Sequence, residues 1–154
     1  MIHKYKKVYV ILLTGLLFFS MFRLSITSGS SMENTLKNNS ISLTTRLIGK
    51  LDYKDIVIIN TSNRKEIGQD MIIKRVIGLP GDVLEFRDNQ LYRNGELIIE
   101  DYIKEPMNST ANFSLELKEN EYFCCGDNRN NSLDSRVEYI GPFRREEIMY
   151  KLIK

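Results

Sequence analysis

The sequence predicts a mainly β protein, with one antiparallel β domain and a single N-terminal transmembrane helix. Three observations lead to this class. Short apolar segments recur along the chain after Thr27, turn residues separate them, and an uncharged apolar run lies near the N-terminus. The chain has 154 residues, of which 42% are hydrophobic and 27% charged, so it is long enough for one folded domain and is not disordered in composition.

The N-terminal segment has the features of a membrane anchor. The run VYVILLTGLLFFSMF, from Val8 to Phe22, has no charge, and apolar residues continue to Ile26, so residues 7–26 are just long enough to span a bilayer. The lysines in front of the run predict that residues 1–6 are cytoplasmic and that residues 27–154 form an extracytoplasmic domain. A cleaved secretory signal peptide is the alternative, but no Ala-x-Ala-like site follows the run.

Seven segments of the domain are predicted strands, and turn signals separate them. Asn94-Gly95 is the strongest of these signals, because it suits a two-residue hairpin. The C-terminal sequence FRREEIMYKLI, residues 143–153, is predicted to be helical, with a strand as the alternative. The predicted strands are residues 40–47, 55–59, 69–77, 82–86, 90–93, 96–98 and 121–125.

One predicted strand carries a charge on a face that should be buried. In MIIKRVIGLPGD, residues 71–82, strand alternation places Ile72, Lys74 and Val76 on the same face. A buried lysine loses the hydration of its charged form, so its pKa falls and its neutral amine can act as a general base. From periodicity alone, a lysine at a strand edge or one that reaches solvent is the simpler interpretation.

Composition excludes several kinds of chemistry. The only histidine, His3, precedes the apolar run, so the external domain has no histidine for a Ser–His or Cys–His mechanism or for a histidine zinc site. No metal or cofactor is expected. A net charge of +2 is not typical of a nucleic-acid-binding domain. Cys124 and Cys125 are adjacent, which disfavours a disulfide between them, and both are predicted core residues.

Two polar segments could complete a hydrolytic site. SGSSMENTL, residues 28–36, can present the hydroxyl of Ser30 or Ser31 at a turn, although such sequences are commonly linkers. GDNRNNSLDSR, residues 126–136, is dense in groups that can fix a geometry, and a solvated loop is its alternative.

The chain resembles the type I signal peptidases in four segments that follow one another in the family's order. These are the anchor, SGSSMENTL, KRVIGLPGD and GDNRNNSLDSR. These are membrane-anchored Ser–Lys proteases that remove signal peptides from exported proteins. The resemblance covers nearly the whole chain, and its compact form is most similar to the enzymes of Gram-positive bacteria. It implies that Ser31 is the nucleophile, that Lys74 is the general base, that Ser132 orients the lysine amine, and that Asp134 and Arg136 brace the loop.

The resemblance also implies how the site works. The backbone N–H of Ser31 is the expected oxyanion donor, and Ser28 and Ser30 are candidates for a second donor because Gly29 lacks the hydroxyl that some family members have there. Ile72 and Leu133 are expected to exclude water from the Lys74 amine.

The implied partners and location follow from the same resemblance. The substrates would be preproteins with small residues at the cleavage site, bound by strand addition. The lipid bilayer is a second partner and the Sec export machinery a candidate third, with the chain a single-pass protein of the cell membrane and its N-terminus cytoplasmic.

Asn34 departs from the family pattern, because it stands where the family usually has proline, and it predicts a looser turn after the nucleophile. Residues 99–117 are the only candidate for a remnant of the extra β domain that larger relatives insert. Two alternatives compete: a Ser–Lys autoprotease of the repressor-cleaving type, and a non-catalytic, membrane-tethered β module that binds an envelope partner.

Overall fold

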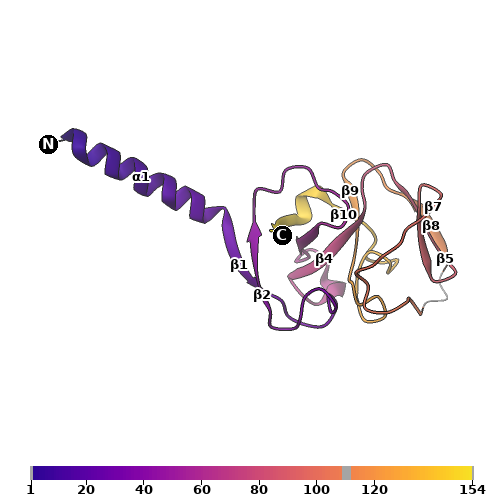
Figure 1. Cartoon of the computed structure of the whole chain (residues 1–154). Helices are drawn as coiled ribbons and strands as arrows, with labels where there is room; N and C mark the ends of the chain where they lie inside the picture. The colour runs from indigo at the N-terminus through magenta and orange to yellow at the C-terminus, as the bar shows by residue number, and fades with distance from the viewer. Residues whose placement is uncertain (1, 109–111, 154) are drawn as a thin grey trace.

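The computed structural model describes residues 2–108 and 112–153 and shows one helix followed by two antiparallel sheets (Figure 1). The elements are α1 (Ile2–Ser20), β1 (Phe22–Ile26), β2 (Ile41–Thr45), β3 (Ile56–Asn60), η1 (Lys65–Ile67), β4 (Met71–Gly78), β5 (Val83–Arg87), β6 (Gln90–Arg93), β7 (Glu96–Leu97), β8 (Phe113–Glu116), β9 (Glu121–Cys125), β10 (Phe143–Arg144), η2 (Arg145–Glu147) and β11 (Ile148–Leu152).

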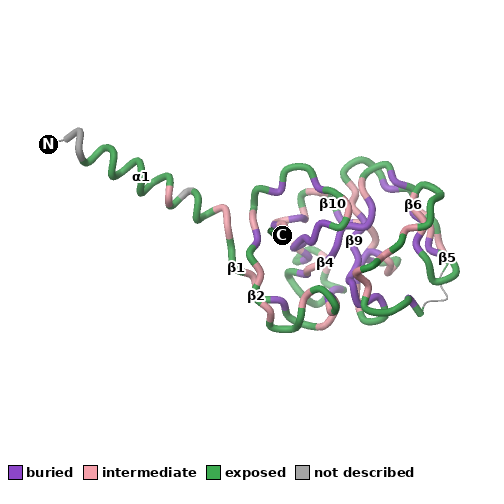
Figure 2. The backbone as a smooth tube through the Cα atoms, in the orientation of Figure 1, coloured by how far each residue is buried: buried purple, intermediate pink, exposed green. Residues whose placement is uncertain are grey.

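Helix α1 projects away from the β domain, and most of its backbone has the colour of exposed residues (Figure 2). Its apolar residues of described burial, such as Ile11 and Phe19, are exposed. Among the described residues, no helix combines the length and the apolar composition that crossing a membrane requires. The helix ends at Ser20, earlier than the predicted span to Ile26, and Phe22–Ile26 instead forms β1. All five residues of β1 pair with β2, which supplies the backbone hydrogen bonds that a helix would otherwise provide.

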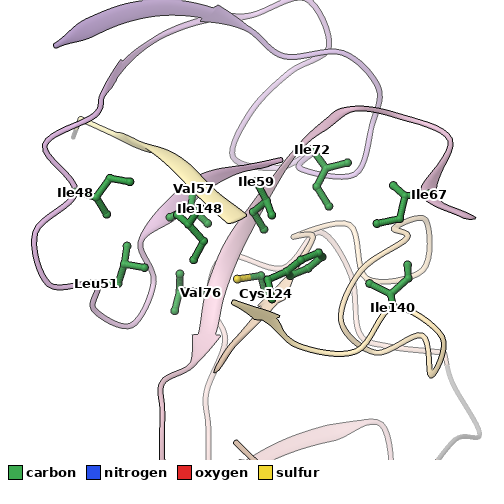
Figure 3. Close-up of a cluster of buried hydrophobic side chains, with 11 residues drawn as sticks. Ile48, Leu51, Val57, Ile59, Ile67, Ile72, Val76, Cys124, Ile140 and Ile148 are labelled. Carbon is green, nitrogen blue, oxygen red and sulfur yellow. The ribbon is translucent and has the colours of Figure 1, made fainter. Parts of the chain in front are cut away.

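The larger sheet has seven strands in the order β1-β2-β11-β3-β4-β9-β10. Its core cluster includes Val57 and Ile59 of β3, Ile72 and Val76 of β4, and Cys124 of β9 (Figure 3). In β4, Ile72 and Val76 belong to this core, so the face that they share with Lys74 is the buried face that alternation predicts.

The smaller sheet has four strands in the order β7-β6-β5-β8. Asn94 and Gly95 connect β6 to β7 with φ angles of 54° and 83°, which confirms the predicted hairpin. Strand β8, which was not predicted, pairs with β5, and Phe113 stacks on Phe86 with ring centroids 4.8 Å apart. Residues 99–117 therefore contribute one strand to this sheet.

Strand β9 joins the two cores, because successive side chains of a strand point to opposite faces. Cys124 lies in the core of the larger sheet, and Cys125 lies with Phe123 in the core of the smaller one. Both cysteines are free and buried, which confirms their prediction as core residues.

The predicted C-terminal helix is wrong, and the strand alternative is correct. Residues 143–153 form β10, the short η2 turn and β11. Strand β11 lies between β2 and β3, so it fills the centre of the larger sheet. Ile148 and Tyr150 are buried there, and the two backbone edges available to the segment outweigh its local helix propensity.

Candidate active site

Three segments that are far apart in the sequence meet at one site. They are the turn that follows β1, strand β4, and the loop between β9 and β10. The Lys74 Nζ donates a hydrogen bond to the Ser31 Oγ over 2.8 Å. This is a distance at which a proton can pass directly between the two atoms.

The lysine is buried where it meets the serine. Lys74 is 3% exposed, with Val57 opposite it on β3. Burial lowers the pKa of its amine from the usual 10.5, although the Asp134 carboxylate acts in the opposite direction. The amine therefore loses its proton more readily than a lysine in water.

The main chain around Ser31 is held by the loop that follows β9. The Asn128 N–H donates to the Ser31 carbonyl over 3.0 Å, and the Asn128 side-chain amide donates to the Ser30 carbonyl over 3.1 Å. The Asn131 amide donates to the Ser30 Oγ over 2.9 Å. The N–H of Ser31 itself makes no hydrogen bond within the described part of the chain, so it is free to bind a substrate oxygen.

Asp134 and Arg136 form a two-bond ion pair inside this loop. The Arg136 Nε and Nη2 donate to the two Asp134 carboxylate oxygens over 2.9 and 2.8 Å. Burial favours the neutral acid, but the hydrogen bonds and charge of Arg136 lower the pKa of Asp134, which remains ionised. Asp134 also accepts a hydrogen bond from the Gly126 N–H, which fixes the two ends of the loop together.

Ser132 lies beside Ser31 but is not bonded to Lys74 in this structure. Its hydroxyl is buried and makes no hydrogen bond of good geometry to the described residues, although it is close enough to the Asp134 carboxylate to help lower the pKa of that acid. The hydroxyl and the Ser31 carbonyl oxygen both occupy the space that a side chain at position 126 would need, the carbonyl oxygen lying 2.5 Å from an ideal Cβ. Gly126 is therefore required for the close approach of the two serines.

Sequence reasoning missed two charged residues that fix the site. Arg75, directly after the lysine, donates to both carboxylate oxygens of Asp127 over 2.8 and 2.6 Å. The Thr35 hydroxyl donates to the same carboxylate and accepts a hydrogen bond from Arg75 over 3.0 Å. Glu100 binds Arg129 over 2.6 and 2.7 Å and is buried with it. The sequence gives no signal for Glu100, because its partner lies 29 positions away.

A groove of about 300 Å³ leads to Ser31 and Lys74. It runs between β1 and β4. Within the described chain, β1 pairs only with β2, so its other edge is free. Strand β4 pairs with β9 only from Arg75 onward, so the part of this edge before Arg75 is free as well. Its walls include Leu24, Ile26, Ser28, Met71, Ile73 and Tyr150.

Main-chain N–H and C=O groups of both strands point into the groove, because these groups alternate between the two edges of a strand. Those of Asp70 and Val76 bond toward β3, so those of Met71 and Ile73 point to the free edge of β4. Thr27 bonds on the β2 side through both its N–H and its carbonyl, so the polar groups of Leu24 and Ile26 point to the free edge of β1. An extended peptide can therefore bond to either edge.

A second cavity of about 190 Å³ shares Ser31 and Lys74 with the groove. Ile72 and Leu133 line it on the apolar side, and Ser28 and Ser30 on the polar side. Among residues 2–108 and 112–153, no group of three histidine, cysteine or acidic side chains could hold a metal ion. The arrangement suits acid–base and nucleophilic chemistry by the serine and the lysine.

Comparison with known proteins agrees with this geometry. The protein-family description that matches the chain is "Signal peptidase, peptidase S26", over residues 2–153. Signal peptidase I S of Bacillus subtilis is 36% identical over 80% of this chain and 70% of its own length. Signal peptidase I P of Bacillus subtilis subsp. natto is 33% identical over 84% of this chain and 74% of its own. A crystal structure of a signal peptidase I from Enterococcus faecalis superposes with a TM-score of 0.55 and 30% identity, covering 69% of this chain and 98% of that one.

Proposed function

The chain belongs to the type I signal peptidases, the serine endopeptidases of family S26 that remove signal peptides, and we propose that its Ser31 and Lys74 carry out the cleavage. The observation that carries the proposal is the 2.8 Å hydrogen bond between a buried lysine amine and a serine hydroxyl at the end of an open groove. Membership of this family decides against a repressor-type autoprotease and against a non-catalytic β module.

In the proposed mechanism, neutral Lys74 takes the proton from the Ser31 Oγ while this oxygen attacks the scissile carbonyl carbon. The tetrahedral intermediate collapses, the peptide C–N bond breaks, and Lys74 gives its proton to the leaving amine. The signal peptide is then esterified to Ser31. Lys74 next takes a proton from a water molecule, whose oxygen attacks the ester carbonyl carbon. The bond between this carbon and the Ser31 Oγ breaks, Lys74 returns the proton to the Ser31 Oγ, and the signal peptide leaves as a carboxylic acid.

The free N–H of Ser31 is the proposed donor to the oxyanion of both tetrahedral intermediates. Ser28 is the better placed of the two candidates for a second donor, because it lines both cavities with Ser31. Ser30 lines only the second cavity, and its hydroxyl oxygen accepts a hydrogen bond from the Asn131 amide. We assign to Ser132 the role of orienting the amine, as the family resemblance implies; in this structure its hydroxyl makes no hydrogen bond to Lys74.

The signal peptide is proposed to lie in the groove as an added strand between β1 and β4. The free main-chain groups of Ile26 and Ile73 would fix its backbone, and the narrow space next to Ser31 would admit small side chains such as alanine. A positively charged side chain at the cleavage positions would meet no acidic group in the groove, whose charged wall residues are Arg23 and Lys74.

The membrane is the proposed location of the reaction, with residues 1–6 cytoplasmic and the β domain outside. Helix α1 presents apolar side chains on all sides, with Tyr9, Ile11 and Phe19 each at least 69% exposed. The exposed Leu24 and Ile26 of β1 continue this apolar surface toward the groove. Such a surface is stabilised by lipid, and it would hold the groove where signal peptides emerge.

The direct test is cleavage of a preprotein by the full chain in detergent micelles. We expect one cut after an Ala-x-Ala-like sequence, located by N-terminal sequencing of the product. A substrate whose last signal-peptide residue is changed from alanine to lysine is the matched control and should remain intact. Cleavage of both substrates, or of neither, would contradict the proposal.

The rate is expected to fall on acidification, because the base is the unprotonated amine of Lys74. Since burial lowers the pKa of this amine, the acid limb of the kcat profile should have its midpoint below 10.5, the usual pKa of lysine. In D134N, the carboxylate that favours the charged amine is gone, so the limb should move to still lower pH. The E146Q variant removes an exposed carboxylate and should leave the limb in place. A kcat that is constant from pH 5 to pH 9 would argue against a lysine base.

A further inference from the structure

The turn after the nucleophile is built in a way that proline does not permit. Asn34 has a φ angle of 90°, in the left-handed region of the backbone. The proline ring holds φ near −65°, so the residue usual at this position in the family cannot adopt this turn. Asparagine tolerates positive φ better than most side chains, which makes it a suitable residue here.

The Asn34 side chain ties the turn to a distant segment of the chain. Its amide nitrogen donates hydrogen bonds to the carbonyl oxygens of Tyr102 and Ile103 over 3.2 and 3.4 Å. These carbonyls belong to residues 100–104, which we call the strap; it follows β7 on the way to β8. The Asn34 side chain therefore supplies contacts that a proline lacks, and the looser turn stays a prediction.

The strap itself is fixed on the loop that follows β9, residues 126–136. At one end, Glu100 is buried in its ion pair with Arg129. At the other, the Lys104 N–H donates to the Asp127 carbonyl over 2.9 Å. The Lys104 side chain also meets Glu33, beside Asn34, over 2.8 Å, but this pair is exposed and contributes little. The strap thus links the loop that holds Ser31 to the turn that follows it.

The geometry points to Asn34 as a positioning residue for Ser31, acting through the strap in place of the proline usual in the family. Asn34 lines neither of the two cavities that contain Ser31, so it does not touch the substrate. It acts on the short turn in which the Glu33 N–H bonds to the Ser30 carbonyl and the Leu36 N–H to the Met32 carbonyl. A shift of this turn moves the oxygen and the N–H of Ser31 relative to Lys74, and catalysis is sensitive to displacements of about 1 Å. This inference rests on the proposed role of Ser31.

Three substitutions of Asn34 distinguish the effect of its backbone conformation on kcat from the effect of its side-chain hydrogen bonds. N34G keeps access to positive φ and removes the amide, and we expect kcat to fall about 5-fold, in line with the loss of the two bonds. N34D keeps the shape but places a carboxylate against two carbonyl oxygens, so about a 10-fold loss is expected. N34P imposes the wrong φ and should cost more than about 20-fold. KM should stay within about twofold throughout, because the groove is unchanged.

The control is N39D, which alters another exposed asparagine at a positive φ of 62° that follows in the same segment. The Asn39 side chain makes no hydrogen bond to the described residues, so kcat should stay within about twofold of that of the unmodified chain. All rates are taken on preprotein cleavage, well below the Tm of each variant, so that loss of folded protein does not lower kcat. If N34P fails to fold, the kcat values of N34G and N34D still show whether Asn34 positions Ser31.

Two outcomes would overturn the inference. The first is a kcat for N34D and N34G equal to that of the unmodified chain, even with a lowered Tm, since Asn34 would then only stabilise the fold. The second is a rise in KM with unchanged kcat, which would place Asn34 in substrate binding. Failure of the unmodified chain to cleave any preprotein is a different result, because it would remove the proposed function itself and this inference with it.

Discussion

Replacement of Lys74 by methionine is expected to lower kcat by about 1000-fold or more without unfolding the protein. General acid–base catalysis alone contributes typically about 100- to 10,000-fold, and in the proposed mechanism Lys74 acts as both the base and the acid. Methionine has a similar length and no charge, so it suits the buried position, where Lys74 is 3% exposed. Initial rates on a preprotein substrate and the Tm from circular dichroism are the two measurements.

The controls for this prediction distinguish a base from a charge. K74R retains a cation that cannot lose its proton, so it should be as inactive as K74M. K118M removes an exposed lysine after β8 and should leave kcat unchanged. S31A should be equally inactive, and the double variant S31A/K74M no worse than either single one, because the two residues act as a unit. More than a tenth of the original rate in K74M would refute the dyad.

The strands with clear alternation and turn residues could be predicted, and the segments decided by distant contacts could not. Asn94-Gly95 specifies its hairpin locally, through two residues that tolerate positive φ. In contrast, Phe22–Ile26 is apolar enough for either a helix or a strand, and pairing with β2 decides for the strand. The C-terminal segment became β11 for the same reason, because β2 and β3 offer it two edges.

The same division applies to the site. Lys74 could be placed on the core face from its neighbours Ile72 and Val76, and the resemblance to the type I signal peptidases supplied its partner, Ser31. The ion pair of Arg75 with Asp127 spans 52 positions, and no local pattern indicates it. Asn34 shows the limit most clearly: its identity in the sequence suggested a weaker turn, and only the fold brings the strap carbonyls to its side chain.

Removal of Asp127 is expected to have the largest effect on stability. The carboxylate is fully buried, and Arg75, 6% exposed, donates two hydrogen bonds to it. D127A would leave the arginine charge buried without its partner, which typically costs about 3–5 kcal/mol in the free energy of unfolding. Urea unfolding measures this loss. The matched control is D101A, which breaks the exposed pair with Lys54 and should leave the unfolding midpoint unchanged.

A double variant then separates stability from activity. In R75M/D127L both charges are gone and apolar side chains fill the space, so much of the free energy of unfolding should return, because an apolar replacement of a buried pair can be neutral or stabilising. The kcat should remain low, since the carboxylate and guanidinium that hold Thr35, four positions after Ser31, are absent. Recovery of both quantities would mean that the pair only fills space. Recovery of stability alone would mean that the fold tolerates an apolar contact there, whereas the placement of Ser31 depends on directed hydrogen bonds between the turn and β4.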